Sequence, residues 1–214
     1  MTMKLNNIVC AALLALLALL AAVNSSAQEF VEGQHYQEIK PAVATSAAEG
    51  KVEVLELFWY GCSHCYAFEP QLSEWAKSKP EYVEFVRVPA VFAHNWEIHA
   101  RAYYAAQQLG VLEKIHQPLF DAIHKHGRKV FSEPELTQFI SDQGVEAAAF
   151  KTAYNSFDVD TKTRHAIALT REYGITGVPA LIINGKYRSS AQQAGDFTTL
   201  LKLVDFLADK EHKR

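Results

Sequence analysis

Two cysteines three positions apart, Cys62 and Cys65, directly follow the apolar segment 52–60. Thiols this close together can form a small disulfide ring, which opens and closes by exchange with the thiols of other molecules. If a helix begins at Cys62, its unpaired backbone amides and its dipole stabilise a thiolate there. The spacing therefore indicates thiol–disulfide exchange as the chemistry of this segment.

The two sulfurs are expected to differ in acidity. The helix dipole contributes about 0.3 to 2 kcal/mol to an anion in the first turn, and the backbone amides of His64 and Cys65 can donate to the Cys62 sulfur. Positive character on the His64 ring would lower the pKa of Cys62 further. Cys65 lies nearly one turn deeper and is expected to keep a higher pKa. We therefore predict that Cys62 exchanges with the partner and that Cys65 resolves the mixed disulfide.

A stabilised thiolate also sets the direction of the reaction, because it stabilises the reduced dithiol form. A disulfide whose reduced product is stabilised is a strong oxidant. In this two-electron couple, a tenfold change in the equilibrium constant corresponds to about 30 mV. The sequence thus favours a pair that oxidises other thiols.

A C-x-x-C pair is also half of a zinc site. The second half would need two suitably spaced histidines within the length of a zinc finger, and none of the nine histidines provides it. The aromatic residues Trp59 and Tyr66 and the proline Pro70 favour redox use instead. The His-Lys-His segment at 124–126 is predicted to be a solvated helix end rather than a metal site. No metal is expected.

The N-terminus has the layout of a cleavable secretory signal peptide. Lys4 is followed by the apolar run 8–23, and small residues lead up to Ala27. We predict a signal peptide over residues 1–27, cut after Ala27. A membrane anchor is the alternative, but a spanning helix needs about 20 apolar residues and this run is shorter. Cys10 lies in the run and would leave with the peptide.

Composition narrows the function further. The formal net charge is −3 with histidines neutral, and loss of Lys4 would make the mature chain one unit more negative. Proteins that bind nucleic acid usually carry a basic face, so nucleic acid is not expected as a partner. An exported chain of this size has enough core to fold without disulfide staples, so the cysteine pair is predicted to be reactive rather than structural.

Hydrophobic periodicity predicts the elements that position the pair. Helical patterns dominate the middle of the chain, strand patterns flank them, and Asn184-Gly185 predicts a hairpin turn. Strands separated by helices imply a partly parallel sheet, to which the hairpin adds an antiparallel edge. The predicted order is strand 52–60, helix 62–77, strand 82–88, helices 95–110, 112–125, 132–144, 146–154 and 158–173, strands 180–183 and 186–188, and a last helix. Asn95, Ser132 and Asp196 are the predicted caps of the helices that begin there.

Three features together resemble the thioredoxin superfamily: the motif Cys62-Ser63-His64-Cys65, the following Pro70, and Gly177-Val178-Pro179 before an Ala-Leu-Ile-Ile strand. The helical block and the C-x-H-C motif are similar to its DsbA family of periplasmic thiol:disulfide oxidants. The resemblance covers about residues 30–207. It implies an α/β thioredoxin fold, built from 28–89 and 158–214, with an inserted all-helical domain over 90–157.

The resemblance also implies roles for residues near the pair. Pro179 occupies the position of the family's cis-proline, which lies beside the disulfide and offers backbone groups to an extended substrate segment. Val178, Gly177 and Ser63 are expected to contact the substrate. From the residues alone, an ordinary trans proline that opens a strand is the alternative. Ser63 stands where the best-known members have proline in C-P-H-C, so a somewhat less oxidising pair is predicted.

Glu56 lies six residues before Cys62 and matches the acid that this family buries under its active site. Val54, Glu56 and Phe58 share one face of the predicted strand, which places the carboxylate between apolar neighbours. An unpaired buried charge is costly, so the carboxyl group should be hydrogen-bonded or protonated. It is expected to relay a proton to or from Cys65. A structural carboxylate satisfied by a lysine or water is the alternative.

These features predict an exported, monomeric protein-disulfide oxidoreductase that needs no organic cofactor. It would donate the Cys62–Cys65 disulfide to reduced, unfolded proteins newly exported to the periplasm, and the resemblance implies a quinone-linked membrane reoxidant of the DsbB type. Two alternatives stay open at this point. A reductase or isomerase of the same fold would use the pair in another direction, and a metal or cytochrome-maturation chaperone would use it as ligands.

Overall fold

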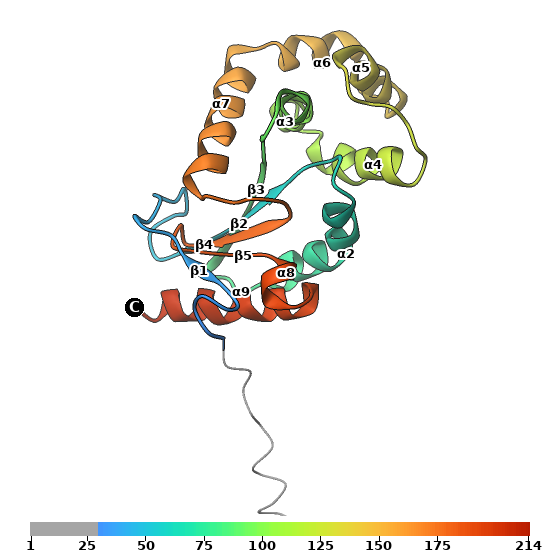
Figure 1. Cartoon of the computed structure of the whole chain (residues 1–214). Coiled ribbons are helices and arrows are strands. Elements are labelled where there is room, and N and C mark those ends of the chain that lie inside the picture. The colour runs from blue at the N-terminus through green and yellow to red at the C-terminus, as the bar shows by residue number, and fades with distance from the viewer. Residues whose placement is uncertain (1–29) are drawn as a thin grey trace, which may run out of the picture. The chain divides into compact units, whose positions relative to one another are not determined.

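The described part of the chain contains five strands in one mixed sheet: β1 (Gln37–Glu38), β2 (Val52–Phe58), β3 (Val83–Pro89), β4 (Ala180–Ile183) and β5 (Tyr187–Ser189). Their order in the sheet is β1-β5-β4-β2-β3 (Figure 1). β2 pairs in parallel with β3, and the other neighbouring strands pair antiparallel. The computed structural model describes residues 30–214, so the predicted signal peptide and Cys10 lie outside the described residues.

The helices follow the predicted order closely: α2 (Ser63–Ser78), α3 (His94–Gln108), α4 (Leu112–His124), α5 (Glu133–Asp142), α6 (Ala147–Tyr154), α7 (Phe157–Glu172), α8 (Ala191–Ala194) and α9 (Phe197–His212). α9 contacts β2, β4 and α2, while α3 contacts α6 and α7. In Figure 1, α3, α5 and α6 lie together on one side of the sheet and α9 lies on the other. The treatment of residues 90–157 as a separate inserted domain stays a prediction.

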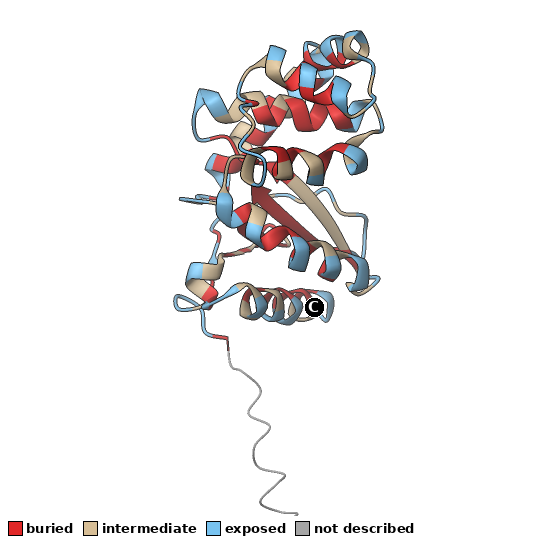
Figure 2. Cartoon of the chain, turned by 90° about the vertical axis from the view of Figure 1, so that its right-hand side faces the viewer, coloured by how far each residue is buried: buried red, intermediate tan, exposed pale blue. Residues whose placement is uncertain are grey.

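β2 lies between β4 and β3 in the sheet, and all seven of its residues are buried. Its parallel register places Glu56 directly opposite Arg87 on β3. The buried residues of α9 recur every three or four positions, including Leu200, Leu203 and Leu207. Figure 2 shows buried residues along the sheet and on the inward faces of the helices. The neighbouring strands and α9 therefore hold β2 in place, and the cysteine loop begins at the end of this strand.

The predicted hairpin turn between β4 and β5 is confirmed. Asn184 and Gly185 have φ values of 52° and 64°, in the left-handed region that a two-residue turn of this kind requires. A Cβ atom on Gly185 would lie 2.0 Å from the carbonyl oxygen of Val43. Glycine is therefore required at this position by both its conformation and its surroundings.

Two short elements, β1 and α8, were not predicted, and one helix start was wrong. β1 has two residues and α8 has four, too few to show a period. α3 begins at His94, so Asn95, the predicted cap, lies inside the helix. The N-cap is Ala93, whose side chain makes no capping hydrogen bond. The start of α3 therefore has no polar side-chain cap.

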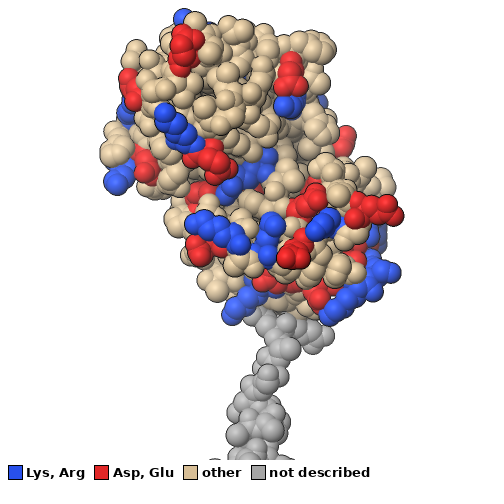
Figure 3. Space-filling model, turned by 180° about the vertical axis from the view of Figure 1, so that it is seen from behind, with Lys and Arg blue, Asp and Glu red and all other residues tan. Residues whose placement is uncertain are grey.

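The described surface carries charges of both signs. On the face that Figure 3 shows, lysine and arginine side chains alternate with aspartate and glutamate side chains. This face offers no broad basic area of the kind that nucleic acid binds. Among residues 30–214, no helix has the length and apolarity needed to cross a membrane.

The cap of α5 generates a stability prediction. The Ser132 hydroxyl accepts a hydrogen bond from the Glu135 amide at 3.4 Å and donates one to its carboxylate at 2.9 Å. Ser132→Ala should therefore lower the free energy of unfolding by about 1 kcal/mol, as measured by chemical denaturation. Ser141→Ala, an exposed position in the last turn of the same helix, is the control and should not destabilise. Equal losses in both variants would contradict a capping role.

Candidate active site

Cys62 is the N-cap residue of α2, and Cys65 lies in the first turn of that helix. The Cys62 sulfur accepts a hydrogen bond from the Cys65 amide at 3.4 Å. Both thiols are free, with Cys62 half-buried and Cys65 buried completely. The helix thus begins where the sequence predicts it, with one sulfur near solvent and the other inside.

The loop before Cys62 is packed tightly against an aromatic ring. A Cβ atom on Gly61 would lie 2.4 Å from the Trp59 ring, so this position requires glycine. Trp59 in turn stacks on Trp96 of α3, with 4.1 Å between the ring centroids. The amide of Cys62 donates to the carbonyl of Trp59 at 2.9 Å. The cysteine turn is therefore fixed to α3 as well as to the end of β2.

The pKa of Cys62 is lowered to about 6. A hydrogen bond from the Cys65 thiol is the largest cause, burial opposes it, and the amides of Cys65 and His64 and the charge of the His64 ring add to the lowering. Burial raises the pKa of Cys65, and its interactions with Cys62 and Glu56 raise it further. The directions agree with those predicted. The contribution of the Cys65 thiol itself was not foreseen.

A turn from another part of the chain completes the surroundings of Cys62. The Val178–Pro179 peptide bond is cis, as predicted, and the Cys62 thiol donates to the carbonyl oxygen of Val178 at 3.3 Å. Gly177 is exposed and Val178 is half-buried. The structure therefore brings together the two motifs that lie more than a hundred positions apart in the sequence.

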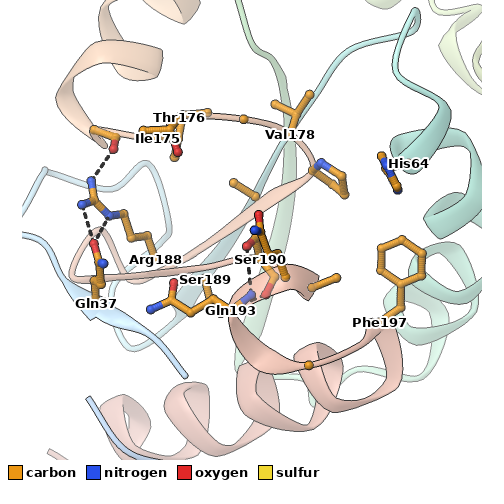
Figure 4. Close-up of a pocket in the computed structure, with 17 residues that line it drawn as sticks. Gln37, His64, Ile175, Thr176, Val178, Arg188, Ser189, Ser190, Gln193 and Phe197 are labelled. Atoms are coloured by element: carbon orange, nitrogen blue, oxygen red, sulfur yellow. Dashed lines mark hydrogen bonds between the residues drawn. The ribbon is translucent and has the colours of Figure 1, made fainter. Parts of the chain in front are cut away.

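A cavity of about 740 Å³ adjoins this turn. Figure 4 shows the Val178 turn and the side chains of His64 and Phe197 at one end, and Arg188 with Gln37 at the other. Arg188 donates to Gln37 and to the carbonyls of Tyr173 and Gly174. The lining comes from four separate parts of the chain, and only His64 and the Gly177-Val178-Pro179 turn belong to motifs recognised in the sequence.

Glu56 is almost completely buried, as its place on β2 predicts, and accepts a hydrogen bond from Nε of Arg87 at 3.2 Å. Burial raises its pKa to about 8, Arg87 opposes this, and repulsion from Glu69 adds to it. The partner is thus a basic side chain, although an arginine and not a lysine, so the structural alternative stays open beside the proton relay.

Four polar residues around Glu56 were missed by the sequence analysis: Glu69 and Ser73 on α2, Arg87 on β3 and His116 on α4. Nη2 of Arg87 donates to Glu69 at 2.7 Å and to Ser73 at 3.1 Å. Strand alternation could have revealed Arg87, because it pairs directly with Glu56. No comparable signal marks His116, which arrives from a distant helix.

The predicted solvated helix end at 124–126 is wrong for His124. Its Nε2 atom lies 2.8 Å from the carbonyl oxygen of Tyr60, and its ring stacks on Tyr66 with 5.0 Å between centroids. His124 therefore supports the cysteine loop. Within residues 30–214, no three histidine, cysteine or acidic side chains form a group suited to a metal ion.

Comparisons with known proteins point to one family. Residues 86–202 match the model of the DSBA-like thioredoxin domain. The thiol:disulfide interchange protein DsbA of Pseudomonas aeruginosa (strain PAO1) is 39% identical over 207 residues, which cover 97% of this chain and 97% of that protein. The chain belongs to the DsbA family. The DsbA protein of Azotobacter vinelandii is 42% identical over 179 residues, covering 84% of this chain and 83% of that one.

Solved structures of the DsbA family have the same fold. The crystal structure of Pseudomonas aeruginosa DsbA has a TM-score of 0.83 and 40% identity, covering 87% of this chain and 97% of that chain. The oxidoreductase DsbA from Xylella fastidiosa has a TM-score of 0.80 and 33% identity, covering 87% and 99%. The predicted α/β thioredoxin fold with a helical insertion is confirmed.

Membership of the DsbA family also confirms the predicted class of enzyme. The chain is a protein-disulfide oxidoreductase rather than a metal or cytochrome-maturation chaperone. The contributions of individual residues to that activity are taken up below as proposals.

The acidity of Cys62 can be measured directly. In the reduced protein, the ultraviolet absorbance of the thiolate should rise with a midpoint near pH 6, and Cys62→Ser should abolish this transition. Cys65→Ala removes the largest favourable contact but keeps the backbone amides. Its midpoint should therefore lie above 6 and below the ordinary cysteine value of about 8.5. A wild-type midpoint at that ordinary value would contradict the assignment.

Proposed function

We propose that the chain oxidises reduced, unfolded proteins after their export by donating the Cys62–Cys65 disulfide to them. The observation that carries this direction is the difference between the two sulfurs. Cys62 is half-buried with a pKa of about 6, whereas burial raises the pKa of Cys65. Because the Cys62 thiolate stabilises the reduced enzyme, transfer of the disulfide to a substrate is favoured.

The cycle begins when a substrate thiolate attacks the Cys62 sulfur of the oxidised enzyme. The bond to Cys65 breaks, and Cys65 leaves as a thiolate that takes up a proton. A second substrate thiolate attacks the mixed disulfide, which completes the two-electron oxidation of the substrate and releases Cys62 as a stable thiolate. During reoxidation of the enzyme, Cys65 resolves the mixed disulfide with the reoxidant.

The cis-proline turn is proposed to hold the substrate segment. The carbonyl oxygen of Val178 lies 3.3 Å from the Cys62 sulfur, so a chain bound along Gly177, Val178 and Pro179 would pass beside the reactive atom. Ser63, the next residue in the chain, is exposed, and the adjoining cavity offers room for neighbouring side chains. These contacts would orient any cysteine-containing segment largely through its backbone.

Glu56 is proposed to exchange a proton with Cys65. Its pKa of about 8 keeps it largely protonated near neutral pH, and its charge acts on Cys65. A carboxyl group in this state can protonate the leaving Cys65 thiolate. The same carboxylate can take the proton back when Cys65 attacks during reoxidation.

The cellular setting follows from the family and the N-terminal pattern. We propose that residues 1–27 direct export to the periplasm and are cleaved after Ala27. The enzyme would act there as a monomer without an organic cofactor, with residues 90–157 as its inserted domain. A quinone-linked membrane protein of the DsbB type would restore its disulfide.

The central test is oxidation of a reduced, unfolded protein by the pre-oxidised enzyme. The wild type should form disulfides in the substrate, followed by a thiol assay. Cys62→Ser should reduce the rate to that of the uncatalysed reaction, because it has no disulfide to donate. Cys65→Ser should accumulate a mixed disulfide at Cys62 when supplied with oxidised glutathione, visible by mass spectrometry. Full activity of Cys62→Ser would refute the site.

Ser63, one of the two residues between the cysteines, provides a second test. Equilibration with glutathione should give an oxidising potential for the wild type, well above the roughly −270 mV of thioredoxin. Ser63→Pro should raise the potential further, by roughly 30 mV for each tenfold change in the equilibrium constant. A wild-type potential near that of thioredoxin would contradict the proposed direction.

A further inference from the structure

Two buried carboxyl groups share one guanidinium beneath the cysteine loop. Glu56 on β2 and Glu69 on α2 are both almost fully buried. Arg87 contacts Glu56 through Nε at 3.2 Å and Glu69 through Nη2 at 2.7 Å. One guanidinium neutralises one carboxylate, so a second ionised carboxylate would be an uncompensated charge in a buried site. The pair is therefore expected to retain one proton.

The contacts of the two carboxyl groups are unequal. Glu69 accepts hydrogen bonds from Arg87 at 2.7 Å and from the Ser73 hydroxyl at 2.5 Å, and it faces His116. Within the described residues, Glu56 accepts one hydrogen bond, from Arg87. Burial raises the pKa of Glu69, but its contacts with His116, Arg87 and Ser73 outweigh burial and lower it. Glu69 is the better site for the negative charge.

His116 is oriented by a second buried side chain. Its Nδ1 atom lies 2.8 Å from the hydroxyl of Tyr60, and burial raises the pKa of Tyr60, so that hydroxyl keeps its proton. A neutral ring that accepts this proton at Nδ1 carries its own hydrogen on Nε2. That N–H group faces Glu69.

The Nε2 atom of His116 lies close enough to Glu69 to act on the charge of its carboxyl group. It lies 3.4 Å from Oε2 of Glu69 and makes no hydrogen bond within residues 30–214. The rings of Phe58, Tyr103 and Phe120 surround the imidazole, so water has little access to compete. An N–H dipole in such surroundings acts strongly on a nearby carboxylate.

We propose that His116 is a positioning residue that keeps Glu69 ionised, so that the proton shared by the two carboxyl groups resides on Glu56, the group that acts on Cys65. The proposal rests on the oxidase cycle above. When Cys65 leaves as a thiolate, the proton on the Glu56 oxygen passes to its sulfur, which gives a thiol and a carboxylate beside Arg87. The reverse transfer occurs when Cys65 attacks.

Among the described residues, the other side chains around Glu56 and Glu69 do not supply a positive charge. From α3, the Tyr103 hydroxyl donates to the backbone carbonyl of Arg87 at 3.2 Å, and burial raises the pKa of Tyr103. From the cysteine loop, Tyr60 faces His116, and from α2 the Ser73 hydroxyl faces Glu69. Glu113, on α4, acts on Tyr103. The Ser73 hydroxyl and His116 are therefore the two groups in this set that act on Glu69 alone, and His116 has the larger effect on its pKa.

The test follows both carboxyl groups by NMR in the oxidised protein, with isotope-labelled glutamate and with Glu56→Gln and Glu69→Gln for assignment. In the wild type, Glu56 should titrate well above the ordinary range of a glutamate, and Glu69 should be ionised at neutral pH. In His116→Leu, the pKa of Glu56 should fall by about one unit or more, a tenfold change, and that of Glu69 should rise. The rate of substrate oxidation should shift to lower pH while Cys62 titrates as before.

Three variants separate positioning from simple packing. His116→Gln keeps an N–H donor, so both carboxyl groups should titrate as in the wild type. Tyr60→Phe removes the hydroxyl that fixes the tautomer of the His116 ring, and the pKa of Glu56 should shift by an intermediate amount. His99→Gln alters another buried histidine, bonded to the carbonyl of Val130, and should change neither carboxyl group. Unchanged titrations in His116→Leu, or equal shifts in His99→Gln, would overturn the proposal. The NMR result stands even if oxidase activity is absent.

Discussion

A helix N-terminus that keeps one sulfur near water and buries the next is the constraint on which the site depends. Cys62 receives the amides of the first turn, and Cys65, less than one turn further, is removed from solvent. The rest of the loop serves this placement: Gly61 admits the Trp59 ring, and Val178 brings a carbonyl to the outer sulfur. The difference in acidity is thus a property of the loop geometry, which the sheet and α3 hold in place.

Beneath this loop lies a group of buried charges that a core would normally exclude. Removing an ion from water costs several kcal/mol even after relaxation, so the group persists because its members satisfy one another. Glu56 and Arg87 come from the sheet, Glu69 from α2, and His116 from α4. The contacts that balance these charges also join the helical segment to the sheet. Packing and proton chemistry therefore share the same residues.

Much of this organisation can be predicted from local patterns. The C-x-x-C pair, the strand before it, the Asn184-Gly185 turn and the cap at Ser132 each depend on neighbours a few positions away, and each was found. The lining of the cavity and the partners of Glu56 depend on segments that meet only in the folded chain. His116 shows the limit most clearly, because nothing in its own helix distinguishes it from a core histidine. His124 shows the converse, since its exposed sequence context concealed contacts with Tyr60 and Tyr66.

The direct pairing of Glu56 with Arg87 across two parallel strands has a consequence for folding. Side chains alternate between the faces of a strand, so a slip of one residue between β2 and β3 would carry the guanidinium to the opposite face. Glu56 would then be left buried without a counter-charge, and apolar residues alone would not penalise such a slip as severely, because β2 is buried on both faces. The ion pair thereby helps to select the correct alignment of the sheet.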